Sequence, residues 1–181
     1  MPYGGGLLDN VSRQVIRAVP HLNTALDIGA GAGRYGKMIR HEQPATWIKA
    51  VEVERDYVVR FDLREVYNQV AVMPAIDLLR DVDASWDLVT AGDVLEHMRK
   101  SEGVDLLHFL VYRTRWLWLV WPERYIQGSY DGYAAEAHIS VWTEGDIAAL
   151  DTPYRLWCRP PLVGALVRGY PAKIALEAIC E

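Results

Sequence analysis

The sequence has few cysteines and lacks any long apolar run. Cys158 and Cys180 are the only thiols, too few for a disulfide framework or a zinc site. We therefore predict a reducing cytoplasmic location and no metal site. No apolar run approaches the ~20 residues that a membrane-spanning helix needs. The opening "MPYGGGLLDN" also lacks the charged start and apolar middle of a signal peptide.

Clusters of basic residues are also missing. Lys and Arg number 19 against 24 Asp and Glu, which gives a formal net charge of −5. Nucleic-acid-binding surfaces usually carry a patch of Lys and Arg, so a nucleic-acid partner is disfavoured. What the chain does have is apolar content, with 51% hydrophobic residues among 181. A chain of this length and apolar content can form one well-buried core but is short for two. Residues 1–181 are therefore predicted to form a single domain.

Apolar runs of strand length alternate with segments of helical spacing, which is typical of βαβ units. Strands are expected near 24–28, 46–52, 69–73, 86–91, 115–121, 153–158 and 163–168. Helices are expected over much of 10–19, 34–42, 55–67, 101–113 and 143–150. The prediction is an α/β fold with a mostly parallel seven-stranded sheet and helices on both faces.

Three local patterns add detail. The run "RWLWLVW" predicts a central strand with Trp116 and Trp118 on one face and Leu117 and Leu119 on the other, both faces buried. In "WTEGD" a threonine and an aspartate three residues later predict a helix start. The stretch 122–141 is the one long irregular segment, and loops of such length are usually functional or mobile.

The stretch "TALDIGAGAGRYGKMI" predicts a strand that turns through a glycine loop into a helix. Glycine permits positive φ and lets backbone N–H groups approach a ligand at the helix N-terminus. Residues 31–36 also fit the dinucleotide pattern G-x-G-x-x-G, so an NAD-binding protein has to be considered.

The register of the glycines argues against NAD. The first glycine after the strand is Gly29, two residues before the dinucleotide pattern begins. Asp27 would face a pyrophosphate unfavourably, but its carboxylate can accept a hydrogen bond, directly or through water, from the α-ammonium group of an amino-acid-bearing cofactor. Glu52 ends the next strand about 20 residues after Gly33, the spacing at which an acid meets ribose hydroxyls. Alternatively, Glu52 belongs to a solvated turn, or Glu54 takes the ribose.

Three motifs, "LDIGAGAGRYG", "AVEVERDY" and "WDLVTAGDVLEHM", together resemble a class I S-adenosylmethionine-dependent methyltransferase over about residues 20–170. More narrowly, "GRYGKMIR", "GDVLEHM" and a later set of residues resemble a small uncharacterised bacterial and phage subgroup. The later set is Pro122, Gln127, Gly128, Glu136, His138 and Trp142. The resemblance implies the Rossmann-like fold of that class, with S-adenosylmethionine as cofactor and S-adenosylhomocysteine as product.

The same resemblance implies a set of cofactor-binding residues. The glycine loop would line the methionine part, Glu52 the ribose, Val53 and Ile76 the adenine, and Asp93 the region of the sulfur. The full set is Asp27, Gly29, Ala30, Gly31, Gly33, Glu52, Val53, Ile76, Asp77, Asp93 and Val94. The class often has an acid at the position of Ala75, so Asp77 either takes over contact with the adenine amine or caps "DLLRD".

Two histidines are candidate catalytic residues. His97 follows Asp93 by four residues and is either a general base or a group that orders the pocket floor. His138 follows Glu136 by two residues and either orients the substrate or pins the long loop.

The predicted function is methyl transfer to O or N of a small-molecule or glycan acceptor. A non-catalytic module that binds S-adenosylmethionine or its product is the alternative, and an NAD-dependent oxidoreductase is disfavoured by Asp27 and by the glycine register.

Overall fold

A computed structural model describes residues 6–180 and contains one seven-stranded sheet with strand order β3-β2-β1-β4-β5-β7-β6. The strands are β1 (Thr24–Ile28), β2 (Trp47–Glu52), β3 (Gln69–Val72), β4 (Trp86–Gly92), β5 (Thr114–Pro122), β6 (Tyr154–Arg159) and β7 (Leu162–Arg168). All seven lie where the sequence predicts them.

The direction of the strands divides the sheet into two parts. β3, β2, β1, β4 and β5 run parallel, whereas β7 lies antiparallel to both β5 and β6. The chain builds outwards from β1 to β3 and then returns to place β4 on the other side of β1. Loops leaving β1 and β4 therefore diverge, and open α/β sheets bind their ligands in the crevice at such a point.

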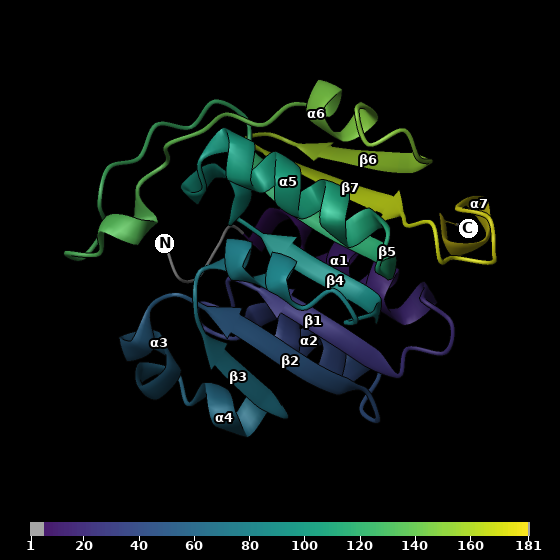
Figure 1. Ribbon diagram of the computed structural model, residues 1–181, viewed down its shortest axis with the longest axis horizontal. Helices are drawn as coiled ribbons and strands as arrows, with labels where there is room; N and C mark the ends of the chain where they lie inside the picture. The colour runs from purple at the N-terminus through teal and green to yellow at the C-terminus, as the bar shows by residue number, and fades with distance from the viewer. Residues whose placement is uncertain (1–5, 181) are drawn as a thin grey trace.

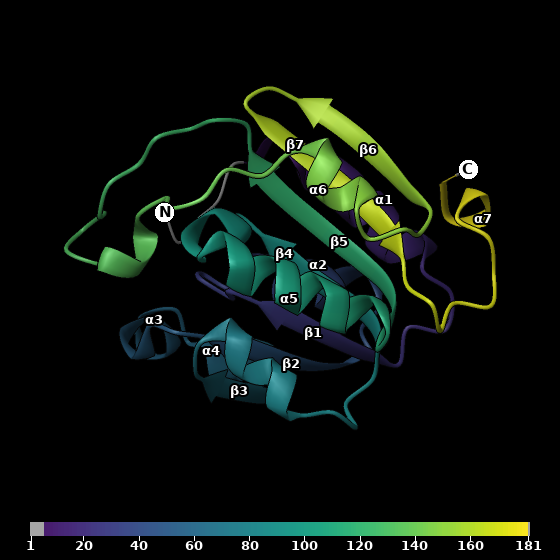
Figure 2. The same cartoon turned by 45° about the horizontal axis from the view of Figure 1, so that its top comes forward.

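Helices cover both faces of the sheet (Figures 1 and 2). On one face lie α1 (Asp9–Ala18), α2 (Arg34–Glu42), α4 (Leu63–Val66) and α7 (Glu177–Cys180). On the other lie α5 (Lys100–Val111), α6 (Glu144–Ala148) and the 3-10 helices η2 (Ala75–Arg80) and η3 (Leu95–His97). The remaining helices are η1 (Gly6–Leu8), α3 (Arg55–Arg60) and η4 (Ala134–Glu136). The α/β class with helices on both faces is thus confirmed.

β5 separates two hydrophobic cores because its side chains alternate between the faces of the sheet. Trp116 and Trp118 pack into the core on the side of α1 and α2, whereas Leu117 and Leu119 pack into the core under α5. All four are 0% exposed, so the predicted burial on both faces is confirmed.

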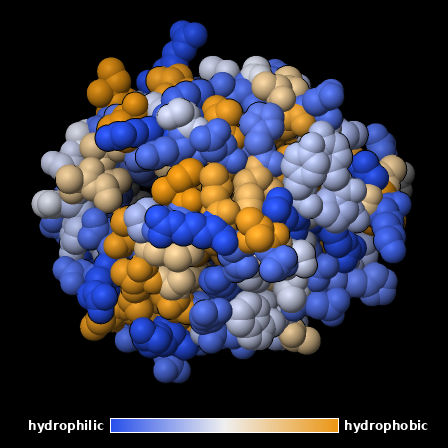
Figure 3. All heavy atoms as spheres, viewed as in Figure 1, coloured by the Kyte–Doolittle hydropathy of each residue, from blue (hydrophilic) through white to orange (hydrophobic). Residues whose placement is uncertain are grey.

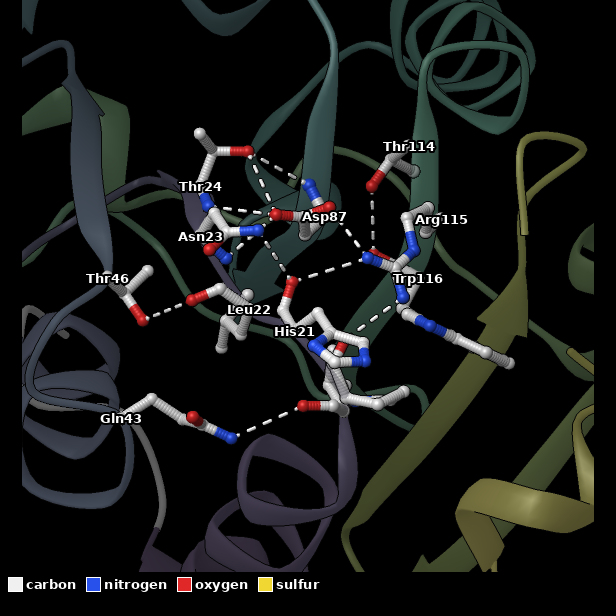
Figure 4. A network of polar contacts seen from close by, with 12 residues as sticks. His21, Leu22, Asn23, Thr24, Gln43, Thr46, Asp87, Thr114, Arg115 and Trp116 are labelled. Carbon is white, nitrogen blue, oxygen red and sulfur yellow. Dashed lines mark hydrogen bonds and ion pairs between the residues drawn. The ribbon is translucent and has the colours of Figure 1, made fainter. Parts of the chain in front are cut away.

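A polar network fastens the amino ends of three strands (Figure 4). The Asp87 carboxylate accepts hydrogen bonds from the backbone N–H groups of Asn23 (2.8 Å) and Thr24 (3.0 Å) and pairs with Arg115 (2.8 Å). Arg115 donates onward to the carbonyl of Pro20 at 3.0 Å. Burial alone would raise the pKa of Asp87, but its hydrogen bonds outweigh burial and lower it. The network holds β1, β4 and β5 together at the end opposite the glycine loop.

Two helical segments differ from their predicted extent. The helix expected over 55–67 is divided into α3 and α4 because Asp62 adopts a left-handed conformation with φ 50°. Residues 75–80 form a 3-10 helix where no helix was predicted. The predicted start of α6 is confirmed, since Thr143 and Asp146 form a reciprocal capping box.

On the face covered by α5 and η2, hydrophobic residues gather near the middle with hydrophilic residues around them (Figure 3). Among residues 6–180, no helix combines the length and apolar character needed to cross a membrane. Of the opening segment "PYGGG", only Gly6 belongs to the described residues.

Candidate functional site

The glycine loop joins β1 to α2 in a conformation that requires glycine. Gly29, Gly31 and Gly33 have φ of 68°, 50° and 75°, values that other residues rarely adopt. A Cβ on Gly29 would also lie 2.3 Å from the Cγ2 of Val94. The Gly29 N–H donates to the carbonyl of Val51 at 2.8 Å, so β2 holds the loop in place. The loop consequently presents its backbone, with no side chain from these glycines, to the crevice.

Asp27 lies behind this loop and not on the wall of the cavity that the loop borders. Its carboxylate is 1% exposed and accepts hydrogen bonds from the hydroxyls of Tyr67 and Thr90, the latter at 2.7 Å. Burial raises the pKa of Asp27 to about 6, although hydrogen bonds from Tyr67 and Thr90 oppose the shift. Asp27 is therefore an internal anchor that supports the loop from below, and its contact with an α-ammonium group, direct or through water, stays a prediction.

Glu52 faces the loop from the end of β2. Its carboxylate accepts hydrogen bonds from the N–H of Gly31 (2.7 Å) and the N–H of Glu54 (2.9 Å). The side chain is 4% exposed, and burial is the main cause that raises its pKa. A carboxylate offers about four lone pairs, so two remain for a ligand. Glu52 is thus a fixed acceptor opposite the backbone of the loop.

Most of the predicted cofactor-binding residues line two adjoining cavities. The first, of about 100 Å³, is lined by Gly29, Ala30, Gly31, Glu52, Val53, Asp93, Val94 and His97 among others. The second, of about 200 Å³, shares Gly29, Val53, Val94 and His97 with the first and adds Ile76. Three predicted residues lie outside both walls: Asp27 behind the loop, Gly33 at the start of α2, and Asp77, which pairs with Arg80 at 3.2 Å.

A third cavity, of about 240 Å³, adjoins the first through Asp93 and His97. Its wall also includes Glu96, Tyr125 and His138, so it lies between η3 and the long loop, residues 123–143. This loop leaves the carboxyl end of β5 and extends beyond the edge of the sheet (Figure 1). The third cavity therefore offers space for a second ligand beside the first cavity.

The two candidate histidines meet at this cavity, with ring centroids 4.8 Å apart and planes at 80°. Nδ1 of His97 lies 3.1 Å from the carbonyl of Ala137, and Nδ1 of His138 lies 2.7 Å from the carbonyl of Tyr125. A carbonyl only accepts, so Nδ1 is the protonated nitrogen in both rings and Nε2 carries the lone pair. Burial is the main cause that lowers the pKa of His97, which keeps its imidazole neutral at pH 7.

Several residues at the site were not predicted. The Tyr57 hydroxyl donates to the Glu136 carboxylate at 2.8 Å and closes the first cavity against the long loop. Glu96 is 2% exposed, and burial together with nearby Asp93 raises its pKa well above the usual range. These residues lie within or near the motifs described above. Their contacts join segments that are far apart in the sequence, and a local sequence pattern does not specify such contacts.

The strand order, the antiparallel β7 and the ligand crevice above β1 and β4 define the class I methyltransferase fold. Solved structures agree: an O-methyltransferase family protein from Burkholderia thailandensis is 11% identical with a TM-score of 0.63, over 90% of this chain and 56% of that protein. This chain thus spans little more than half of that protein. No protein-family model matches the sequence, and no curated protein is significantly similar to it.

Two further structures cover most of both chains. The plantazolicin methyltransferase BpumL in complex with S-adenosylhomocysteine is 12% identical with a TM-score of 0.66, over 90% of this chain and 84% of that one. The N-terminal domain of EvdMO1, determined in the presence of S-adenosylhomocysteine and D-fucose, is 16% identical with a TM-score of 0.65, over 91% and 83%. At such identities the likeness establishes the fold.

Proposed function

We propose that this protein is an S-adenosylmethionine-dependent methyltransferase acting on O or N of a small-molecule or glycan acceptor. The observation that carries the proposal is the buried Glu52 carboxylate, held opposite the positive-φ glycine loop in a single cavity. The size of the third cavity favours a small acceptor group, and D-fucose in the EvdMO1 experiment fits the glycan end of this range. Membership of the bacterial and phage subgroup stays a prediction.

The cavity walls fit the proposed cofactor. Glu52 has lone pairs for the two ribose hydroxyls, and the loop backbone leaves room for the methionine part because Cβ atoms are absent at its glycines. Val53 and Ile76 offer apolar surface for the adenine. Asp93 lines both the first and the third cavity, whereas Val94 lines the first and the second. In this proposal Asp27 acts indirectly, by fixing the loop, and Asp77 is not part of the wall.

When bound, the cofactor supplies a methyl group already activated on a sulfonium. The protein's own part is then to align the acceptor and to handle its proton. Alignment can lower a barrier by roughly 7–11 kcal/mol in favourable cases. His97 lies on the walls of all three cavities and is neutral, with a lone pair on Nε2. We therefore propose His97 as the group positioned to take up the acceptor's proton. His138 shares that wall and holds the loop through Tyr125.

An oxidoreductase is disfavoured by the sheet itself. The dinucleotide-binding fold has six parallel strands in the order 3-2-1-4-5-6, whereas here an antiparallel β7 is inserted between β5 and β6. The anchored Asp27 carboxylate beneath the loop also opposes a pyrophosphate above it.

Calorimetric titration with S-adenosylhomocysteine and separately with NADH tests the cofactor. We expect binding of S-adenosylhomocysteine alone. Glu52→Gln removes a charge that accepts two ligand hydrogen bonds, so its affinity should be roughly 10–100-fold weaker. The exposed Glu65→Gln is the matched control and should bind as the wild type does. Binding of NADH without S-adenosylhomocysteine would overturn the assignment.

Turnover needs a second measurement. Formation of S-adenosylhomocysteine from S-adenosylmethionine, screened over hydroxyl- and amine-bearing small molecules and sugars, should identify an acceptor. Gly31→Val should abolish it, because a branched side chain is strained at φ 50° and its Cβ would project from the loop. Turnover equal to the wild type in Gly31→Val would place the cofactor elsewhere.

A further inference from the structure

Three side chains with metal-binding chemistry converge beside the proposed cofactor cavity. Glu96, His97 and His138 each offer a ligand atom, and these atoms all lie within 4.8 Å of one another. Glu96 and His97 belong to η3, directly after β4, whereas His138 comes from the long loop. All three line the third cavity, so there is open space next to them.

The carboxylate of Glu96 has no other use in the part of the chain that the structure describes. It is 2% exposed, and neither Oε1 nor Oε2 has a hydrogen-bond partner among these residues. A buried carboxylate without a partner is costly, and proteins normally pair such a group or use it to coordinate a metal. Its position is enforced, because the backbone carbonyl of Glu96 accepts from the N–H groups of Ile139 (2.8 Å) and Ser140 (3.1 Å).

The two histidines are oriented as metal ligands usually are. A ligating imidazole typically donates its second N–H to a carbonyl or carboxylate, which fixes the tautomer and the ring orientation. His97 donates from Nδ1 to the carbonyl of Ala137, and His138 donates from Nδ1 to the carbonyl of Tyr125. In both rings the remaining lone pair is on Nε2, the atom available to a metal.

The donor set selects the kind of ion. Two imidazoles and one carboxylate suit a divalent first-row transition metal, whereas Mg²⁺ and Ca²⁺ prefer oxygen ligands. Zinc lies about 2.0–2.2 Å from such ligands, which places the ligand atoms of a tetrahedral site about 3.3–3.6 Å apart. The candidate ligand atoms lie within 4.8 Å of one another, so metal binding would draw them closer together. Three protein ligands leave a position open, as in catalytic metal sites.

We propose that Glu96, His97 and His138 bind a divalent transition-metal ion whose open position takes an oxygen of the acceptor. Metal binding itself is independent of the proposed function, whereas this role of the ion rests on it. The acceptor's O–H bond breaks, the proton passes to solvent water, and the electron pair remains on the oxygen, stabilised by the ion. That oxygen would then form a bond to the methyl carbon as the S–CH3 bond of the cofactor breaks, with the electron pair of that bond staying on the sulfur. When the ion is bound, the Nε2 lone pair of His97 binds the metal, so His97 then does not take up the proton itself.

Cobalt titration tests the site without any acceptor. Chelator-treated protein is titrated with Co²⁺ and followed by its visible absorption, with Zn²⁺ competition and calorimetry as a second readout. Wild type should bind one ion per chain. Affinity should fall at least about 10–100-fold in Glu96→Gln and in His138→Ala, since loss of even an outer-shell partner has that effect. The exposed His108→Ala is the control and should bind as wild type does.

Binding of S-adenosylhomocysteine and the melting temperature are measured for each variant, so that unfolding is distinguished from loss of a ligand. Absence of one-to-one Co²⁺ binding to folded wild type, or unchanged binding in folded Glu96→Gln and His138→Ala, would overturn the metal site and leave the cofactor assignment standing. If wild type binds Co²⁺ but not S-adenosylhomocysteine, the metal site stands and the proposed function fails.

Discussion

Gly36 in the first turn of α2 provides a direct test of how the glycine loop is supported. A Cβ at this position would lie 2.3 Å from Cε1, 2.4 Å from Cζ and 2.6 Å from the hydroxyl of Tyr67. The Tyr67 ring is 4% exposed, and its hydroxyl donates to Asp27. Because the ring is buried, Gly36→Ala should displace it from Asp27 only by straining the core around it.

The expected loss of stability follows from three contributions. Forcing a methyl group into a packed core typically costs about 1–3 kcal/mol. Weakening a hydrogen bond to the buried Asp27 carboxylate adds about 1–3 kcal/mol. Alanine in place of glycine in a helix restores up to about 1 kcal/mol. We therefore expect Gly36→Ala to lower the free energy of unfolding by about 1–6 kcal/mol, or the melting temperature by roughly 2–24 °C.

Thermal unfolding of Gly36→Ala beside Gly145→Ala isolates this effect. Gly145 is exposed in α6, and a Cβ there would meet only the Thr143 hydroxyl, at 3.6 Å. The control should be neutral or slightly stabilised. Adding Tyr67→Leu to Gly36→Ala should cost less than the sum of the two single changes, because the clash is removed. A melting temperature for Gly36→Ala equal to that of Gly145→Ala would refute the reasoning.

Three further outcomes are expected. S-adenosylhomocysteine at a hundredfold excess over Kd should stabilise the protein by about 2.7 kcal/mol, seen as a rise in melting temperature of about 5–11 °C; no shift would contradict the cofactor assignment. Because the pKa of Asp27 is raised from 3.8 to about 6 on folding, the folded state holds the extra proton, and stability should fall by about 2 kcal/mol as pH rises from 4 to 6. The free energy of unfolding, measured with denaturant at each pH, should fall more steeply with pH in the wild type than in Asp27→Asn. Two curves that run parallel over this pH range would disprove the prediction. Asp87→Ala should cost about 1–3 kcal/mol by leaving the Arg115 network unpaired, while calorimetry shows unchanged S-adenosylhomocysteine affinity; weakened affinity in folded protein would show that the two ends of the sheet are coupled.

The sheet could be predicted from the sequence because its signals are local. Alternation in "RWLWLVW" and the recurring apolar runs report which residues are buried without reference to their partners. The division of the 55–67 segment at Asp62 escaped prediction because a single left-handed residue breaks the helix there, and aspartate adopts that conformation only in some contexts.

In the candidate site too, some features could be predicted from local sequence and others could not. Glu52 and the glycine loop belong to adjacent βα units whose spacing is set by the fold, and the structure brings them together. The Tyr67–Asp27 anchor and the grouping of His138 with Glu96 depend on how a crossover and a long loop pack, which no periodicity encodes. The expectation of no metal site rests on the scarcity of cysteine and stays a prediction, whereas the metal site proposed above uses histidine and glutamate.

The long loop contributes to both ligand cavities. Ala135 and Glu136 close the first cavity, where Glu136 is held by Tyr57, while His138 borders the third. One segment of backbone thus roofs two neighbouring compartments, and a ligand that holds it down on one side restricts exit on the other. In the proposed methyltransferase, a ligand in either compartment would hold the same backbone over both, so exchange at one site would be coupled to occupancy of the other.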